Sequence, residues 1–244
     1  MINYILLFSA GVFAGFINVT SGGGSLITLP LMIFLGMPPV IANGTNRIAV
    51  LIQSIVASGN FRRHGRKDLR AGLYLGLAAV PGAAAGALTA VHLSDTAFKW
   101  ILASAILLGL LVVVFHRQPP AGREVIRKKW LQMLLFLFIG FYGGVIQAGT
   151  GYLIIFSLTM VGGLGLARTN SIKSIAISIY LIPSIFVFAA KGCVQLLPGL
   201  ALAAGGSIGG FLGSSFSHSM NPKWTKLILA VVLTGMSIKL IIGS

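Results

Sequence analysis

The sequence predicts an all-α integral membrane protein with about ten hydrophobic segments, arranged as two inverted five-segment repeats. Three observations predict this fold class. Of the 244 residues, 56% are hydrophobic and only 9% are charged, whereas a soluble domain has about 25% charged residues. Residues 1–46 and 131–167 contain no charged side chain, and apolar stretches of this length indicate membrane helices. A polar, glycine-rich motif also occurs in both halves of the chain, about 129 positions apart.

The hydrophobic segments fall into two sets of five. Residues 1–115 form the predicted first repeat, 116–129 a cytoplasmic basic linker, and 130–244 the predicted second, inverted repeat. The linker contains prolines and a glycine among its charges, which separates the two sets. In chain order, the predicted segments are 3–17, 25–36, 43–61, 71–92 and 97–115, then 130–147, 152–165, 169–190, 196–217 and 224–243.

The first two segments of each repeat are too short to cross a membrane in full, which takes about 20 residues. We therefore expect each pair to form a re-entrant hairpin or a broken helix with its turn near mid-membrane, where the glycine-rich motif lies. Backbone bends at that depth survive only where protein buries them or where they line a watery cavity. Paired interruptions at corresponding positions of two halves are typical of a transporter's midplane site.

The later segments carry packing patterns. Segments 71–92 and 196–217 repeat small residues at four-residue spacing, which lets helix backbones approach closely in lipid. We expect these faces to pack helices together, with ligand contact as the less favoured alternative. Pro81 and Pro183 are expected to kink their helices, because proline lacks an amide hydrogen and clashes with the preceding turn.

The order of matches between the halves predicts a duplication. An odd number of segments in each half requires the second copy to enter the membrane upside down. The loop at 62–70 is strongly basic, which marks the cytoplasmic side, whereas its counterpart near 191–196 has only Lys191. Both termini are then expected on the outer side, and inverted repeats suit alternating access. The matching positions are Gly11, Gly15, Gly22 and Thr45-Asn46 with Gly140, Gly144, Gly151 and Thr169-Asn170.

The ionisable residues exclude several classes of function. The three acids, Asp68, Asp95 and Glu124, fall in predicted loops, so neither a carboxylate proton relay nor a cation site is expected in the membrane. The four histidines lie at segment ends and Cys193 is the single cysteine. We therefore expect no metal, no cofactor and no enzyme activity. The net charge of +15 is concentrated in short loops, which favours contact with anionic lipid headgroups over nucleic acid.

The candidate binding site consists first of the two hairpin tips. A half-helix that begins at Ser25 or Tyr152 would direct free amides and a positive dipole end toward mid-membrane. Together with uncharged hydrogen-bonding side chains, these amides suit an oxyanion such as a sulfonate, a sulfite or a carboxylate. The alternative is that the polar groups only satisfy the broken backbone. The tip residues are Asn18, Ser21, Gly22, Gly23 and Gly24 in the first copy, and Gln147, Thr150 and Gly151 in the second.

Two cations near the starts of later helices complete the candidate site. Arg47 follows Asn46, and Lys173 follows Asn170 three positions later. A cation at membrane depth costs about 2.5–3.5 kcal/mol, so it usually has a partner. That partner could be a carbonyl, a lipid phosphate or a transported anion. Structural snorkelling and attraction of a substrate both remain open for these two residues.

Paired motifs carry a resemblance to a known family. The first half contains GVFAGFIN at 11–18, GGG at 22–24, LP at 29–30 and ANGTN at 42–46. The second half contains GFYGGVIQ at 140–147, GTG at 149–151 and ARTNSIK at 167–173. Over essentially the whole chain, the sequence resembles the TauE/SafE family, the sulfite exporter-like bacterial membrane transporters.

The resemblance implies a small-anion transporter of the cytoplasmic (inner) membrane, with sulfite, sulfonates and related organic anions as the substrate class. The leading hypothesis is a secondary carrier that works by alternating access at a midplane site, and the alternative is a passive anion channel. An intramembrane enzyme would need a nucleophile with a base or metal ligands at depth, which the sequence lacks. The expected partners are a small anionic solute and the lipid bilayer, and a homo-oligomer is left open.

Overall fold

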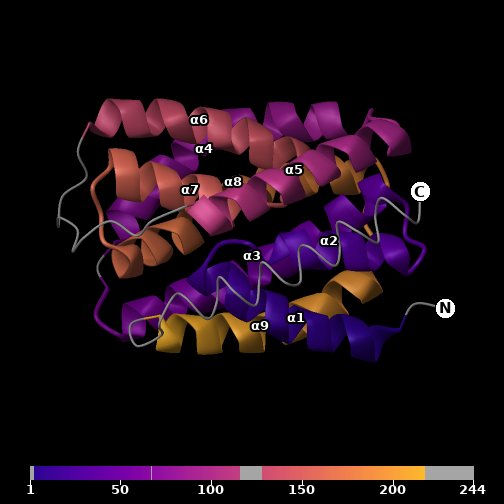
Figure 1. The fold of residues 1–244 in the computed structure, drawn as a ribbon, viewed down its shortest axis with the longest axis horizontal. Coiled ribbons are helices and arrows are strands. Elements are labelled where there is room, and N and C mark those ends of the chain that lie inside the picture. The colour runs from indigo at the N-terminus through magenta and orange to yellow at the C-terminus, as the bar shows by residue number, and fades with distance from the viewer. Residues whose placement is uncertain (1–2, 67, 116–127, 218–244) are drawn as a thin grey trace.

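The computed structural model describes residues 3–66, 68–115 and 128–217, and these are helical apart from short connections. The helices run along the long axis of the molecule (Figure 1). In chain order they are α1 (Tyr4–Thr20), α2 (Ser25–Phe34), α3 (Pro39–Arg63), α4 (Leu69–Ala90), α5 (Asp95–Phe115), α6 (Lys129–Val145), α7 (Thr150–Phe156), the π-helical turn η1 (Ser157–Val161), α8 (Leu166–Ala190) and α9 (Leu196–Phe216).

The predicted segments correspond to these helices, with shifts of a few residues at their ends. Helix α3 begins at Pro39, ahead of the predicted start at residue 43. Proline is well suited to the first helical position, where its missing amide hydrogen would have no partner in any case. Helix α7 begins at Thr150, ahead of the expected Tyr152. The predicted segment 224–243 and linker residues 116–127 lie outside the described residues.

In each half a short turn joins the first helix to a short second one: α1 to α2, and α6 to α7, which continues into η1; we call these two pairs the hairpins. Two glycines make their tight turns. Gly22 follows the end of α1 with φ +92°, and Gly149 precedes α7 with φ +78°. A left-handed residue is a common way to end a helix, and glycine adopts that conformation without steric cost. The second arms of the hairpins are short, as the segment lengths predicted.

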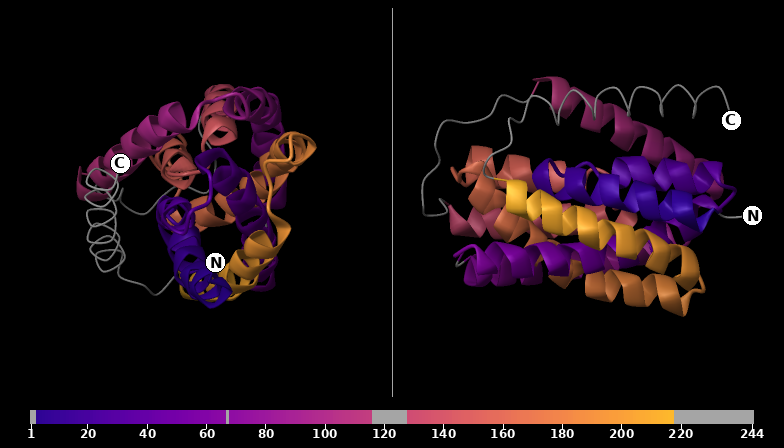
Figure 2. Two further views of the ribbon diagram at one scale, coloured as in Figure 1. Left: turned by 90° about the vertical axis from the view of Figure 1, so that its right-hand side faces the viewer. Right: turned by 90° about the horizontal axis from the view of Figure 1, so that it is seen from below.

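Each short first helix packs on a long helix from the other half of the chain. Helix α1 packs on α9, and α6 packs on α4, while α3 and α8 also contact α9 and α4 respectively. Figure 2 shows α9 alongside α1. The small-residue faces form these contacts: a Cβ added at Gly205 would strike the carbonyl of Phe8, and one at Gly82 would strike the carbonyl of Leu137. The predicted packing role of the glycine faces is confirmed, since backbones at this spacing exclude side chains.

The described helices have an apolar core and an apolar outer surface. Two clusters of buried aliphatic and aromatic side chains fill the interior, and large apolar side chains such as Ile5 and Phe186 point outward. Trp100 and Trp130 are exposed near the starts of α5 and α6, as is common at membrane interfaces. Among the described residues, α3, α4, α8 and α9 are long and apolar enough to cross a bilayer.

Candidate functional site

The two hairpin tips touch each other at a pair of glycines. A Cβ on Gly22 would lie 2.6 Å from the carbonyl carbon of Gly151, and a Cβ on Gly151 would lie 2.5 Å from the Cα atom of Gly22. Any side chain at either position would push the tips apart, because the atoms it meets are backbone atoms. The turns from the two halves of the chain are therefore in direct contact inside the protein.

Arg47 of α3 is fully buried and binds the C-terminal end of α6. Its Nη1 donates to the carbonyl of Gly143 at 2.9 Å, and its Nη2 donates to the carbonyl of Gly144 at 2.6 Å. One turn earlier on α3, Asn43 Nδ2 donates to the carbonyl of Val145 at 2.9 Å. The last carbonyls of α6 are thus satisfied by one cation and one amide from the other half of the chain.

Lys173 of α8 binds the C-terminal end of α1 in the same way. Its Nζ donates to the carbonyls of Asn18 and Val19 at 2.9 and 3.0 Å. Asn170 Nδ2 donates to the carbonyl of Thr20 at 3.1 Å, and Asn170 Oδ1 accepts a hydrogen bond from Lys173 Nζ at 2.9 Å. An asparagine and a cation again hold a helix end that belongs to the opposite half.

These contacts identify the partners of both intramembrane cations. The last carbonyls of a helix have no partner within it, and they form the negative end of its dipole. Of the three partners considered from the sequence, the structure gives Arg47 and Lys173 carbonyl oxygens. Each cation therefore lies at the negative end of a helix dipole and donates to its last carbonyls.

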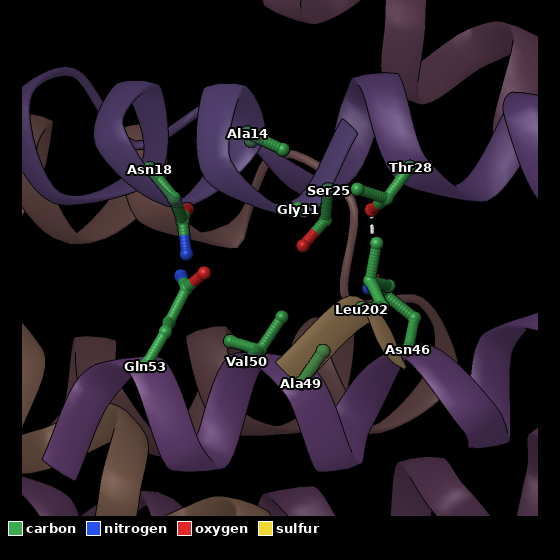
Figure 3. Close-up of a pocket in the computed structure, with 11 residues that line it drawn as sticks. Gly11, Ala14, Asn18, Ser25, Thr28, Asn46, Ala49, Val50, Gln53 and Leu202 are labelled. Atoms are coloured by element: carbon green, nitrogen blue, oxygen red, sulfur yellow. Dashed lines mark hydrogen bonds between the residues drawn. The ribbon is translucent and has the colours of Figure 1, made fainter. Parts of the chain in front are cut away.

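A small cavity, the tip cavity, lies between α1, α2, α3 and α9. Its volume is about 10 Å³, which is room for about one water molecule. Figure 3 shows that Asn18 of α1 and Gln53 of α3 point toward one another across it. The polar side chains on its wall are Asn18, Ser25, Thr28, Asn46 and Gln53.

Two amide donors on the wall of the tip cavity have no hydrogen-bond partner among the described residues. They are Asn46 Nδ2 and Gln53 Nε2, and the two side chains are only 1% and 4% exposed. Thr28 Oγ1 donates to Asn46 Oδ1 at 2.7 Å, which fixes the amide and leaves its nitrogen free. A buried donor without an acceptor costs about 1–3 kcal/mol, so both donors favour a ligand that brings acceptor oxygens.

The N-terminus of α2 also favours hydrogen-bond acceptors in the tip cavity. Gly24 and Ser25, at the N-terminus of this ten-residue helix, lie on the wall of the tip cavity. A helix N-terminus presents backbone amides and the positive end of the helix dipole, and it attracts anions. The cavity thus combines unpartnered amide donors with a positive helix end, and none of the described residues on its wall is an acid.

Comparison with known families identifies the family of the chain. Residues 7–240 match the family described as sulfite exporter TauE/SafE. The chain belongs to this family. Three relatives are named as probable membrane transporter proteins: ORF9 of Sinorhizobium sp., 31% identical over 96% of this chain and 91% of the relative; a protein of Haemophilus influenzae, 28% identical over 97% and 93%; and YfcA of Escherichia coli K12, 26% identical over 98% and 90%. No solved structure matches the chain.

Family membership makes this TauE/SafE chain a multi-pass membrane transporter and not an enzyme. Of the sequence-predicted site residues, the tip cavity brings together Asn18, Gly24 and Asn46. Arg47, Lys173 and Asn170 lie at the helix ends described above.

The remaining predicted residues of this TauE/SafE chain lie around the contact between the tips. Gln147 is buried, and its Nε2 donates to the hydroxyl of Tyr180 at 3.2 Å. Thr150 Oγ1 donates to the carbonyl of Gln147 at 3.0 Å. Ser21 caps the end of α1 and Gly23 lies in the turn before α2. The side chains of the second tip are therefore engaged by Tyr180 of α8 and by the tip's own backbone, whereas the first tip faces a cavity.

Sequence reasoning missed Gln53 and Thr28 as parts of the candidate site, and it used Ser25 only as the start of a half-helix. Gln53 lies seven residues after Asn46 on α3, a spacing of about two turns that places both side chains on one helix face. A second amide at this spacing in an apolar helix was the available signal. The hydroxyl groups of Ser25 and Thr28 were a weaker signal, because hydroxyl groups in membrane helices often bond only to their own backbone.

Proposed function

We propose that the protein is a secondary transporter of a small oxyanion of the sulfite or organosulfonate class, with its binding site at the tip cavity. The observation that carries the proposal is the pair of buried amide donors, Asn46 Nδ2 and Gln53 Nε2, which lack partners on one cavity wall. An oxyanion has several acceptor oxygens and can satisfy both donors at once. Hydrogen bonds to a charged acceptor are about twice as strong as neutral ones.

The charges around the site support a negatively charged ligand. In the described residues the acids are Asp68, which precedes α4, and Asp95, the first residue of α5. Neither lies on the wall of the tip cavity. The negative ends of α1 and α6 are held by Lys173 and Arg47, whereas the positive end of α2 faces the cavity. An anion gains from this arrangement, and a cation would find no counter-charge.

The packing between the halves supports two inverted repeats. The contact of α1 with α9 has its counterpart in the contact of α6 with α4, and the contact of α3 with α9 has its counterpart in that of α8 with α4. The helix-end contacts are paired in the same way. Asn43 and Arg47 of the first half bind the end of α6, and Asn170 and Lys173 of the second half bind the end of α1. Such pairing suits a rocking motion in which the halves trade conformations.

The size of the tip cavity supports a gated carrier over an open channel. A volume of about 10 Å³ holds about one water molecule, which is less than an oxyanion of four heavy atoms requires. Solute entry therefore requires the hairpin of α1 and α2 to move relative to α3. In the cytoplasmic membrane, a negative interior potential favours anion exit by about 2.3 kcal/mol per charge per 100 mV.

The test is anion uptake by purified protein in proteoliposomes, with a panel of sulfite, methanesulfonate, sulfoacetate, acetate and chloride. Gln53→Leu removes one donor at nearly constant volume. A hydrogen bond to a charged group contributes about 1.5–3 kcal/mol, so KM for the preferred anion is expected to rise by about 10- to 100-fold. Gln53→Glu places a negative charge on the wall and is expected to abolish uptake.

A matched pair of threonine variants separates binding from folding. Thr28→Val removes the hydroxyl group that orients Asn46, and Thr159→Val removes a buried hydroxyl group that bonds only to the carbonyl of Ile155 in the other hairpin. We expect a higher KM for the first variant alone. The site assignment fails if Gln53→Leu transports like wild type. Large currents without stimulation by trans substrate would favour the channel.

A further inference from the structure

A second and larger hollow opens where α3 ends and α4 begins. Its volume is about 620 Å³, which lies within the range of small-molecule binding sites. We call it the basic hollow. Three arginines on its wall, Arg62, Arg66 and Arg70, come from the end of α3, the following loop and the start of α4. Ser171 of α8 forms part of the opposite wall.

Among the described residues, the wall of the basic hollow contains no acid. The nearest acid in the sequence is Asp68, which is 5% exposed and accepts a hydrogen bond from Arg168 Nε at 2.7 Å. The other oxygen of Asp68 has no hydrogen-bond partner among the described residues, so this carboxylate does not bond to Arg62 or Arg70. His64 of the same loop contacts the carbonyl of Asn60 through Nδ1. Arg62 and Arg70 are both exposed.

The basic hollow and the tip cavity share helix α3, and α8 links the basic hollow to the end of α1. Arg62 lies nine positions after Gln53 on α3, which is about 14 Å along the helix axis at 1.5 Å per residue. Ser171 directly follows Asn170, whose side chain holds the end of α1, and α1 supplies Asn18 to the tip cavity. An anion in the basic hollow therefore lies close to the hairpin of α1 and α2, which must move before the anion can enter the tip cavity.

We propose that the basic hollow is a second oxyanion site, which binds the solute with low selectivity before or after it occupies the tip cavity. The proposal rests on the proposed function. Guanidinium groups bind sulfonate, sulfite and carboxylate groups in a bidentate manner. A cleft lined by one sign of charge also concentrates ions of the opposite sign and raises their association rate. The basic hollow thus increases the local anion concentration, and the amide donors of the tip cavity discriminate between anions.

The first experiment measures occupancy without transport. Phenylglyoxal modifies exposed arginines, and fragment-ion mass spectrometry locates the products. Full-length protein in detergent is labelled with and without methanesulfonate, which does not react with the reagent. Arg63 is the matched internal control, because it is exposed and adjacent to Arg62 but does not line the basic hollow. We expect methanesulfonate to reduce labelling of Arg62 and Arg70 at least three-fold more than labelling of Arg63.

Equal protection of Arg62, Arg70 and Arg63 by methanesulfonate would overturn the proposal, and so would no protection of any of them. A lipid phosphate has the same chemistry as a solute oxyanion, so a parallel sample contains phosphatidylglycerol in place of methanesulfonate. Protection by the lipid alone would assign the arginines to headgroup binding and overturn the solute site. Because this experiment needs no transport, it can succeed even if the anion panel shows no uptake and the proposed function fails.

The second experiment measures the effect on transport from the side of the basic hollow. Arg62→Gln and Arg70→Gln are expected to raise KM for the preferred anion about 3- to 10-fold while kcat stays within two-fold. The dependence of KM on ionic strength should also become weaker, since exposed charges are screened by salt. Arg63→Gln is the control. If it changes KM as much as the other two variants, only overall surface charge matters and the proposal is wrong.

Discussion

Replacing Arg47 by methionine tests whether the halves of the protein are held together at a helix end. The change removes hydrogen bonds from a charged donor to the carbonyls of Gly143 and Gly144 and to Ser184 Oγ, at 2.9, 2.6 and 2.6 Å. It also removes the guanidinium group from the ring of Phe188, whose centroid lies 4.4 Å away. Methionine retains most of the side-chain volume, so the experiment isolates the polar contacts.

The magnitude follows from two opposing terms. Three hydrogen bonds from a charged donor contribute about 4.5–9 kcal/mol at about 1.5–3 kcal/mol each. Removing a buried cation recovers about 2.5–3.5 kcal/mol. Arg47→Met is therefore expected to destabilise the protein by about 2–5.5 kcal/mol, which lowers Tm by about 4–22 °C for a chain of this size. Arg47→Lys keeps the charge but lacks the two-armed donor geometry, so we expect an intermediate loss.

The assay is thermal unfolding of the purified protein in detergent, followed by size-exclusion chromatography and by circular dichroism. Arg63→Met is the control, because this exposed arginine lies near the end of the same helix and surface substitutions usually stay within about 0.5 kcal/mol. If Arg47→Met is as stable as Arg63→Met, the helix-end contacts do not hold the halves together and the reasoning is refuted.

Two further predictions follow from the other contacts of the tips. Lys173→Met should lower stability by about 2–5.5 kcal/mol in the same thermal assay, because three hydrogen bonds from its charged amino group, two to the end of α1 and one to Asn170 Oδ1, are lost against the recovered burial cost. An unchanged Tm would contradict that role for Lys173. Gly151→Ala should separate the tips, because its new Cβ meets the backbone of Gly22, with a loss of about 1–3 kcal/mol and reduced uptake. Gly59→Ala is the control, because nothing outside its own helix lies within 4 Å of the new Cβ. It should be neutral or stabilising by up to about 1 kcal/mol. Similar losses of stability in both variants would show that the contact between the tips is unimportant.

Much of the fold followed from local sequence properties. Apolar length and the lack of charge predicted the membrane helices, and the glycine-rich turns with short flanking segments predicted the two hairpins, because these features act within one segment. The start of α3 was placed at residue 43, whereas the helix begins at Pro39. The sequence did not show that the side chain of Asn43 binds the end of α6, because that contact depends on the packing of helices that are distant along the chain.

The sequence by itself determined that cations and polar turns lie within apolar surroundings and that no acid accompanies them. Only the tertiary structure decided their partners, because those partners are distant along the chain: Arg47 binds a carbonyl 96 positions away, and Lys173 binds one 155 positions away. The same holds for Gln53, whose unpartnered amide depends on what α1, α2 and α9 place opposite it. Local chemistry fixes which groups need a partner, whereas packing across the two halves fixes which of them find one.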